Sequence, residues 1–444
     1  MTYCAIDFGT SNSAIAIAAG TASPAGHPRM QLVPLEGAHL TMPTAVFYAT
    51  DRHDLPPGAV AGPTAADPLP RNHGRAAVQA YIEGYEGRLM RSMKSVLGTA
   101  LAEQTTELGQ GHGVKYLDII SAYLRHLRLK AEQAGGQRLS RVVMGRPVFF
   151  VDDDPARDAS AQAALEAAAR SVGFDEVTFQ FEPIAAAFDH EQHIDHEQTV
   201  LVADIGGGTS DFSVVRVGPA RAQRLERRDD ILANHGVHIA GTDFDRHLSL
   251  QSIMPTLGLG GFGPSIGGQP PRPVPGRVYF DLATWHLINT VYQPARVAEL
   301  RGMTDFYGDP RHHARLMKVL KDRLGHTLVG MAEAAKIETA EGQDTTLALD
   351  VIETGLGTAL SGAQAERALA ADLQRIVQCA HETVRLAGLR DDQVDALYFT
   401  GGSTGLQALT HRLQAAFPQA AAVRGDRLAS VATGLGLHAA RWFA

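Results

Sequence analysis

The segment VLVADIGGGTSDFSVV, residues 200–215, combines two apolar runs with a turn whose residue types suit anion binding. Asp204 closes the first run, and the turn after it holds three glycines and a hydroxyl residue, Gly206, Gly207, Gly208 and Thr209. Apolar runs on both sides of a short turn predict a β-hairpin. Glycine permits backbone angles closed to other residues and leaves peptide N–H groups uncovered, so this turn can surround a phosphate. An ordinary glycine-rich hairpin stays open as the alternative, because a short glycine cluster is a weak motif.

The N-terminal segment YCAIDFGTSNSAIAIA, residues 3–18, repeats this design. An apolar strand ends near Asp7, a second one begins at Ala14, and the turn between them holds Gly9, Thr10, Ser11 and Asn12. Two such hairpins predict two similar half-molecules that face one ligand. Asp7 and Asp204 could hold a hydrated Mg²⁺ between them, because that ion prefers carboxylates, phosphates and retained water. The chain has no GxxxxGK[ST] motif and both turns return to strands, which excludes a Walker loop.

Helices and strands are expected to alternate through the rest of the chain. Apolar residues recur at helical intervals in 114–133, and small and apolar residues predict further helices at 156–174 and 328–340. Strands are predicted at 44–50 and 140–150, and residues 395–417 predict a strand, a glycine turn and a helix. This alternation indicates an α/β architecture.

Three segments stand apart from this alternation. Residues 21–75, outside the strand at 44–50, are expected to be irregular and rich in loops. Residues 257–276, LGLGGFGPSIGGQPPRPVPG, are expected to form an exposed insertion with little regular structure. The last helix, predicted at 430–442, is rich in small residues and is expected to pack closely on a neighbour.

Composition narrows the class of protein. The 444 residues are 45% hydrophobic and 20% charged, an ordinary balance for a soluble globular chain long enough for several domains. A net charge of −8 gives no general basic surface for nucleic acid. No apolar run approaches the ~20 residues of a membrane-spanning helix, and the start lacks the pattern of a signal peptide. The only two cysteines, Cys4 and Cys379, are far apart, so a reducing cytoplasm is expected.

Taken together, the motifs resemble the nucleotide-binding domain of the superfamily that contains actin, sugar kinases and the seventy-kilodalton heat-shock chaperones. The chaperone branch fits best, and within it the short YegD-type proteins, which resemble the DnaK ATPase domain without its C-terminal part. Six segments carry the resemblance in the order of the family: IDFGTSNS, FEPIAAAF at 181–188, ADIGGGTSD, GTDFD at 241–245, EAAK at 333–336 and FTGGST at 399–404.

The resemblance implies a duplicated actin-like ATPase fold of the α/β class, with two lobes around a central nucleotide cleft. The first lobe would span 1–198, with an inserted subdomain around 30–115. The second would span 199–444, with an inserted subdomain around 245–345 that includes 257–276. No C-terminal substrate-binding domain is expected, and hence no ATP-gated site for extended peptides within the chain.

The resemblance also implies roles for single residues. The first turn, Gly9 to Asn12, and the second turn, Gly206 to Thr209, would bind the β- and γ-phosphates, with Asp7 and Asp204 bound to Mg²⁺ through water. The catalytic set implied by the family is Lys94, Glu182, Asp204 and Thr209. Lys94 would neutralise charge on the transferred phosphoryl group, and Glu182 and Thr209 would position the attacking water.

At the other end of the ligand, Glu333 and Lys336 would contact ribose and adenine, and Gly401, Gly402 and Ser403 would line the opposite wall. Gly241 also belongs to the implied nucleotide-binding residues. The chain departs from the family twice here. Gly405 replaces an arginine that covers the adenine, and Ala340 replaces a hydroxyl residue. We therefore expect a weaker hold on adenine and less certain base selectivity.

Each of these residues also has a plain structural interpretation. Lys94 taken alone would be a solvated lysine, Glu182 an acid at a helix start, and Asp211 a turn-stabilising residue. Glu333 and Lys336 could form a surface ion pair of little energetic value. The histidines of DHEQHIDHEQ, His190, His193 and His196, lack a compact zinc-ligand pattern and are expected on a solvated loop.

The function implied by the resemblance is a slow ATPase with ATP and Mg²⁺ as cofactors. It would act as a chaperone-like switch through an unidentified protein partner or co-chaperone, with no nucleic-acid or membrane partner. Two alternatives remain open. A small-molecule kinase of the same fold would need a general-base aspartate, for which Asp211 is suggestively placed, and an actin-like filament subunit would assemble with ATP.

Overall fold

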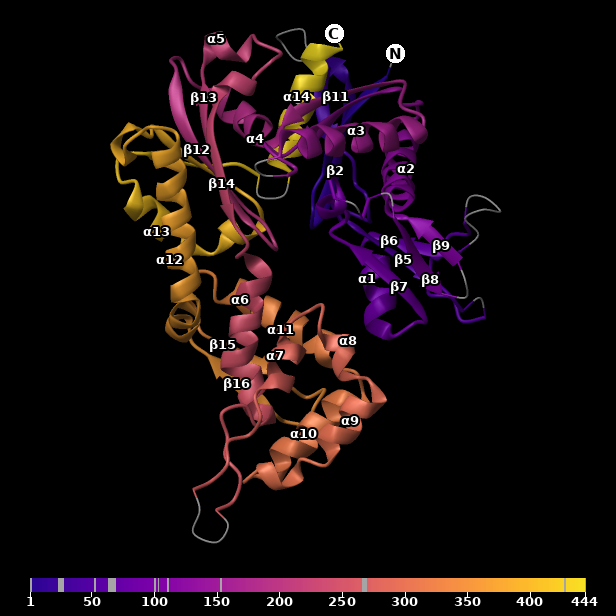
Figure 1. Cartoon of the computed structure of the whole chain (residues 1–444). Coiled ribbons are helices and arrows are strands. Elements are labelled where there is room, and N and C mark those ends of the chain that lie inside the picture. The colour runs from indigo at the N-terminus through magenta and orange to yellow at the C-terminus, as the bar shows by residue number, and fades with distance from the viewer. Residues whose placement is uncertain are drawn as a thin grey trace.

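The protein is described by a computed structural model that covers residues 2–22, 28–51, 53–62, 69–99, 101–102, 104–109, 112–151, 154–265, 270–426 and 429–443 (Figure 1). Its two largest sheets have the same plan. The first runs in the order β11 (Glu176–Phe181), β10 (Arg141–Arg146), β1 (Tyr3–Phe8), β2 (Asn12–Ala22) and β3 (Pro28–Leu32), with β4 (Thr41–Pro43) also paired to β2. The second runs in the order β18 (Ala421–Arg424), β17 (Ala396–Thr400), β12 (Gln198–Ile205), β13 (Ser210–Val217) and β14 (Ile231–Val237).

Strand directions and helices match between the sheets as well. In each, three consecutive antiparallel strands are extended by strands that run parallel to the first of them. The helices around the parallel strands follow in the same chain order: α2 (Tyr116–Gly135), α3 (Pro155–Ser171) and α4 (Glu182–Glu191) in the first half, α12 (Gly362–Leu386), α13 (Gln407–Ala416) and α14 (Ser430–Trp442) in the second. This repetition confirms the predicted duplicated α/β fold.

Local sequence explains where the crossover helices begin. Pro155 opens α3, and the side chain of Asp154 accepts a hydrogen bond of 3.1 Å from the backbone N–H of Arg157. Ser361 and Gln364 form a reciprocal capping box at the start of α12. Both devices satisfy backbone donors that have no partner within the helix, which fixes the first turn.

The prediction for residues 21–75 is wrong over part of its length. Residues 28–32 and 41–43 form β3 and β4, and Arg71–His73 forms a short strand, β6. The strand predicted at 44–50 is confirmed as β5 (Ala45–Ala49). Residues 23–27, 52 and 63–68 lie outside the described residues. The missed strands are short, and their pairing partners lie elsewhere in the chain, so they show little local periodicity.

Each half carries an inserted subdomain before its first crossover helix. The first contains a sheet in the order β6, β5, β7 (Gly87–Arg91), the helix α1 (Gly74–Glu83), a 3₁₀ helix Met93–Val96 and the hairpin β8 (Thr105–Gly109) and β9 (His112–Lys115). The second contains α6 (Gly241–Leu248), α7 (Arg277–Ala283), α8 (Ile288–Val291), α9 (Pro294–Arg301), α10 (Pro310–Lys321), α11 (Gly325–Glu338) and the hairpin β15 (Thr345–Ala348) and β16 (Gly357–Leu360). A short helix, α5 (Pro219–Ala222), lies between β13 and β14.

The segment 257–276 is less exposed than predicted. Its described residues are largely irregular, and Phe262 is 60% exposed, which fits the prediction. However, Leu257 and Val274 belong to the core of the second half, and Phe262 pairs with Pro273 in an isolated bridge. Figure 1 shows the described parts of the segment, up to residue 265 and from residue 270, projecting from the tip of the inserted subdomain.

A shared core joins the two sheets. Helices α4 and α14 contribute Phe188, Leu435 and Ala439 to one buried cluster with residues from both sheets, such as Ala5 and Val202. The predicted close packing of the last helix is confirmed, because a Cβ at Gly434 would overlap the backbone of Ala185 in α4. Both cysteines are buried and free. No helix in the described ranges is long and apolar enough to cross a membrane.

We expect Gly434→Ala to lower the free energy of unfolding by about 1–3 kcal/mol, since the added methyl group must push α14 away from α4. Urea denaturation followed by circular dichroism measures this change. Gly330→Ala is the matched control, because a Cβ at this exposed position of α11 meets no atom within 4 Å. Equal stability of Gly434→Ala and the unsubstituted protein would contradict the close contact.

Candidate active site

The first predicted turn joins β1 to β2 and is held from outside by one threonine. Gly9 must be glycine, because a Cβ there would overlap the carbonyl oxygen of Asn12. Thr44 donates its hydroxyl to the carbonyl of Gly9 at 2.7 Å and its N–H to the carbonyl of Ser11 at 2.9 Å. Asp7 stands opposite Ala14 next to this turn. The carbonyl groups of Gly9 and Ser11 are therefore both engaged by Thr44.

The second predicted turn joins β12 to β13 and is held in the same way. Ser403 donates its hydroxyl to the carbonyl of Gly206 at 2.7 Å. Thr242 donates its N–H and its hydroxyl to the carbonyl of Gly207, at 2.8 and 2.9 Å. The proposed reason for the glycines needs a correction, because none of Gly206, Gly207 and Gly208 has a φ in the left-handed region. Of the three, only Gly207 is restricted by space, and none of them is required for an unusual backbone angle.

The two turns face each other across the gap between the sheets. A Cβ built on Gly207 would lie 3.0 Å from the hydroxyl oxygen of Ser11 and 3.7 Å from its Cβ. A Cβ on Gly208 would meet no atom within 4 Å. Thr10 and Asn12, the other polar residues of the first turn, are exposed. The facing arrangement that the repeated sequence predicted is therefore present.

Lys94 and Glu182 form an ion pair between the turns, although 88 residues separate them in the chain. Lys94 comes from the 3₁₀ helix of the first inserted subdomain, and its Nζ lies 2.5 Å from Oε1 of Glu182, the first residue of α4. Only 8% of Lys94 is exposed, so the interpretation as a solvated lysine is wrong. Burial acts to lower the pKa of Lys94, but the charges of Glu182 and Asp7 outweigh it and raise the pKa above its ordinary value.

Carboxyl groups from both hairpins gather beside this pair. Burial, with the charge of Glu182, raises the pKa of Asp7 to about 8. Burial, with the charges of Asp211 and Glu182, raises the pKa of Asp204 to about 7. Asp211 stands directly opposite Asp204 in the β12–β13 ladder and accepts a hydrogen bond of 2.7 Å from the hydroxyl of Thr209. Buried carboxylates that lie close together repel one another, and a bound cation would relieve that repulsion.

The residues present fit Mg²⁺ held in part by water. Within the part of the chain that the structure describes, no three His, Cys, Asp or Glu side chains form a compact ligand group. Mg²⁺ is commonly held through one or two carboxylates while water and phosphate fill the remaining positions, so Asp7 and Asp204 on facing hairpins suit it. The histidines His190, His193 and His196 make hydrogen bonds to Gln198, Asp189 and Asp195.

A second group of predicted residues meets at the start of α6. Lys336 of α11 forms an ion pair of 2.8 Å with Asp245 and lies 3.4 Å from the carbonyl oxygen of Gly241. A Cβ on Gly241 would lie 2.7 Å from the hydroxyl oxygen of Ser403. Burial raises the pKa of Asp245 to about 6 in spite of the nearby Lys336. Glu333 is exposed one turn before Lys336, which pairs with Asp245 instead of with Glu333.

Gly401 lies beside Asp204. It follows β17 with φ of +86°, and a Cβ there would lie 2.7 Å from Oδ1 of Asp204. Glycine is required here for its backbone conformation as well as for space. Gly402 begins the 3₁₀ helix Gly402–Gly405, which leads into α13.

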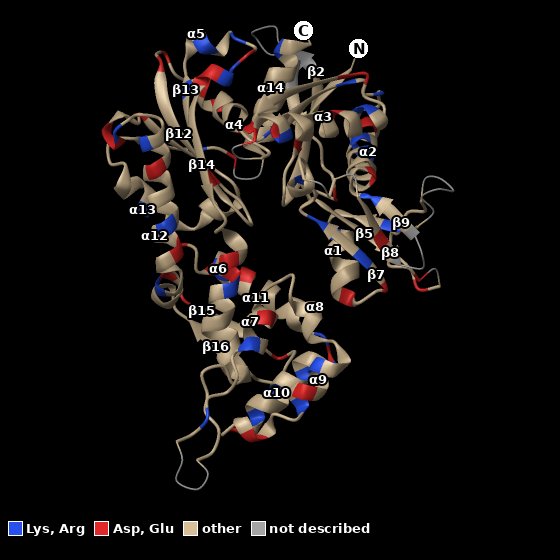
Figure 2. Cartoon of the chain, viewed as in Figure 1, with Lys and Arg blue, Asp and Glu red and all other residues tan. Residues whose placement is uncertain are grey.

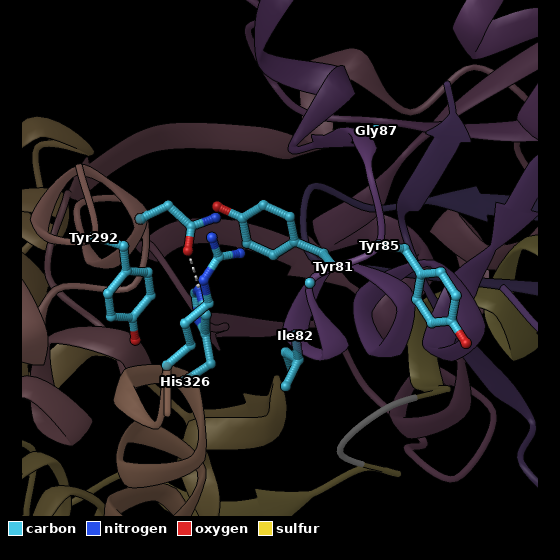
Figure 3. A pocket seen from close by; sticks show the side chains of 9 residues that line it. Tyr81, Ile82, Tyr85, Gly87, Tyr292 and His326 are labelled. Carbon is cyan, nitrogen blue, oxygen red and sulfur yellow. Dashed lines mark hydrogen bonds between the residues drawn. The ribbon is translucent and has the colours of Figure 1, made fainter. Parts of the chain in front are cut away.

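Contacts between the two inserted subdomains close the far side of the gap, and none of them was predicted. Tyr81 of α1 stacks on Trp285 with ring centroids 5.4 Å apart, and the guanidinium of Arg91 lies 4.2 Å from the Trp285 ring. His326 of α11 lies against both rings, at 5.1 and 4.8 Å. Figure 3 shows Tyr81 and His326 beside a small cavity of about 100 Å³ that residues of both subdomains line.

Several residues that hold the turns or pair with Lys336 were not predicted from the sequence. Thr44 bears an ordinary hydroxyl 35 residues from Gly9, and Thr242 lies in the quoted GTDFD segment but was given no role. Asp245 was part of the quoted GTDFD segment, and its position one turn after Gly241 on α6 was a usable signal. Figure 2 shows acidic and basic residues interspersed over both halves, so charge alone does not mark the site.

The model of the family described as Hsp70 protein matches residues 4–251, more than half of the chain. A chaperone protein HscA homolog from Pseudomonas paraeruginosa is 30% identical over 250 residues, 54% of this chain and 35% of that protein. A chaperone protein dnaK from Gracilaria tenuistipitata var. liui is 26% identical over 250 residues, 55% of this chain and 36% of that protein. The matched region thus spans about a third of the length of these relatives. With a duplicated α/β fold and facing glycine turns at the predicted places, the chain belongs to the Hsp70 family.

Proposed function

We propose that the chain binds Mg·ATP between its two hairpin turns and hydrolyses it slowly. The observation that carries this proposal is the buried Lys94–Glu182 pair, which lies beside Asp7 and Asp204 where the two turns face each other. A buried cation among acids, next to two turns suited to phosphate, is an arrangement for phosphoryl chemistry. Membership in a family whose relatives include chaperone proteins supports the same conclusion.

Each residue has a definite task in this proposal. Peptide N–H groups of the turns Gly9–Asn12 and Gly206–Thr209 bind the phosphate oxygens, except that of Gly206, which donates to the carbonyl of Thr209 at 3.0 Å. Asp7 and Asp204 hold Mg²⁺ through water, and the ion neutralises phosphate charge when bound. The Nζ of Lys94 lies against charge that develops on the transferred group. Glu182 and Thr209 orient the attacking water, and Lys336 with Glu333 contacts the nucleoside.

Hydrolysis would change the balance between a closed and an open arrangement of the two halves, because the γ-phosphate would contact turns from both of them. While it is bound, contacts to both turns favour the closed arrangement, and its loss weakens the link between the sheets. The contacts of Tyr81 and Arg91 with Trp285 add a second link, between the inserted subdomains. We propose that this chaperone-type change is transmitted to a protein partner.

Trp285→Ala is expected to speed nucleotide release about tenfold, because an aromatic stack and a cation–π contact each contribute about 0.5–1.5 kcal/mol to the closed state. Stopped-flow release of a fluorescent ADP analogue measures the rate. Phe280→Ala is the control, since Phe280 is 51% exposed on the neighbouring α7. An unchanged release rate for Trp285→Ala would show that the inserted subdomains do not limit release.

One assay separates this function from a kinase. ATP turnover is measured with the chain alone, with a panel of metabolites and with protein fractions from a cell extract. Slow basal turnover that a protein fraction stimulates is the expected result. Acceptor-dependent ADP release would instead identify a small-molecule kinase, for which Asp211, beside Asp204 and hydrogen-bonded by Thr209, is the candidate base.

A further inference from the structure

A cavity of about 500 Å³ lies next to Lys336, on the side of the site away from the phosphate turns. It is bounded by the end of α11, the start of α12 and the start of α13. Much of its lining consists of small residues: Ala340, Gly342, Gly362, Ala363, Ala365 and Ala408. Leu369 and Leu406 add apolar surface. The cavity therefore has room and an apolar wall.

The cavity is continuous with the proposed nucleoside site. Lys336 lines it and also contacts Asp245 and the carbonyl of Gly241. The backbone N–H of Gln407 donates to the carbonyl of Ala340 at 3.0 Å, which fixes the end of α11 against the start of α13. A base that extends past Lys336 would therefore point toward the cavity.

The volume exceeds what a flat base needs. Sites for whole drug-sized ligands have volumes of about 300–1,000 Å³, so 500 Å³ beyond the ribose contact is a large space for one base. Among its charged lining residues, Lys336 pairs with Asp245 at 2.8 Å and Arg412 pairs with Glu366 at 3.0 Å. An apolar group on the outer edge of the base would fill the interior without leaving a charge unpaired.

We propose that this cavity accepts an apolar substituent on the base, so that the chain binds purine nucleoside triphosphates enlarged at the base edge farthest from the ribose. This inference rests on the proposed binding of ATP. It follows from the small residues that line the cavity, among them Ala340 and Gly342, and from the open space between α11, α12 and α13. The chain would then select its nucleotide by the phosphates and ribose more than by the size of the base.

The test compares ATP with N6-benzyl-ATP on the full chain, by competition against a fluorescent ATP analogue in the presence of Mg²⁺. We expect N6-benzyl-ATP to bind as tightly as ATP or more tightly. A loss of affinity of about tenfold or more on adding the benzyl group would overturn the inference while leaving ATP binding intact. Failure of ATP itself to bind would instead contradict the proposed function.

Ala363→Phe locates the substituent. Ala363 is an exposed residue of α12 that lines the cavity, so its enlarged side chain fills space without disturbing the core. We expect the affinity for N6-benzyl-ATP relative to ATP to fall about tenfold. Ala371→Phe, at an exposed position of the same helix outside the cavity, should leave this ratio unchanged. An equal ratio in Ala363→Phe and the unsubstituted chain would place the benzyl group elsewhere and overturn the inference.

Discussion

Replacing Lys94 by alanine is expected to slow ATP hydrolysis by about 10²–10³-fold, the usual loss when one preorganised charge-stabilising donor is removed. ATP should still bind, because the turns and the acids around Mg²⁺ remain. Lys94 is buried and paired with Glu182 before any ligand arrives, so its charge needs no reorganisation during the reaction. Single-turnover hydrolysis separates the chemical step from binding. It is measured with the protein in excess of ATP and at a concentration above the Kd, so that all the ATP is bound.

The main complication is that Lys94→Ala leaves Glu182 unpaired beside Asp7. The double variant Lys94→Ala with Glu182→Gln removes that surplus charge and, because Glu182 also orients the attacking water in the proposed function, is expected to hydrolyse ATP no faster than Lys94→Ala. Lys318→Ala is the control, because Lys318 is exposed on α10, where it pairs with Asp322. Undiminished hydrolysis in folded Lys94→Ala protein would remove Lys94 from the mechanism.

Local patterns predicted the frame of the fold. The two hairpins could be read from the sequence because apolar runs flank each glycine turn, and both were found with Asp7 and Asp204 at the strand ends. Helix α2 is amphipathic and was predicted within two residues of its observed bounds. Strands β3 and β4 were missed, because they pair with β2 at positions that short, weakly patterned segments do not reveal.

Contacts between distant residues were the part of the site that spacing could not predict. The sequence reasoning placed Lys94 and Glu182 in the site through the family resemblance, yet only the structure shows that they pair. The ring contacts between Tyr81 and Trp285 join segments about 200 residues apart. Nothing in either segment indicates the other, because such contacts depend on how the two halves pack.

The glycine turn shows a different limit of sequence reasoning. A run of glycines predicts either unusual backbone angles or close approach, and the sequence alone favours neither. In the structure, Gly206, Gly207 and Gly208 avoid the left-handed region, while a Cβ on Gly207 would lie 3.0 Å from Ser11 Oγ. The sequence therefore predicted glycine at the right place, but the reason for Gly207 is close approach and not an unusual backbone angle. A substitution of Gly207 should therefore act through the volume that it adds.

Gly207→Val is expected to weaken ATP binding by about 100-fold or more, which corresponds to about 2.7 kcal/mol. The two methyl groups of valine would extend beyond a Cβ that already lies 3.0 Å from Ser11 Oγ, into the space between the two turns. The turn cannot easily move away, because Thr242 holds the carbonyl of Gly207 with two hydrogen bonds. Isothermal titration with ATP and Mg²⁺ measures the affinity, and thermal unfolding shows whether the variant is folded.

Two further variants separate crowding at this turn from a general effect of the substitution. Gly330→Val, on the exposed face of α11 with no atom within 4 Å of a built Cβ, should bind ATP with unchanged affinity. Gly207→Ala should lose less affinity than Gly207→Val, because the loss depends on the volume added between the turns and not on backbone angle. Equal losses for alanine and valine would point back to backbone conformation, and normal affinity in a folded Gly207→Val protein would make this turn a structural hairpin that binds no phosphate.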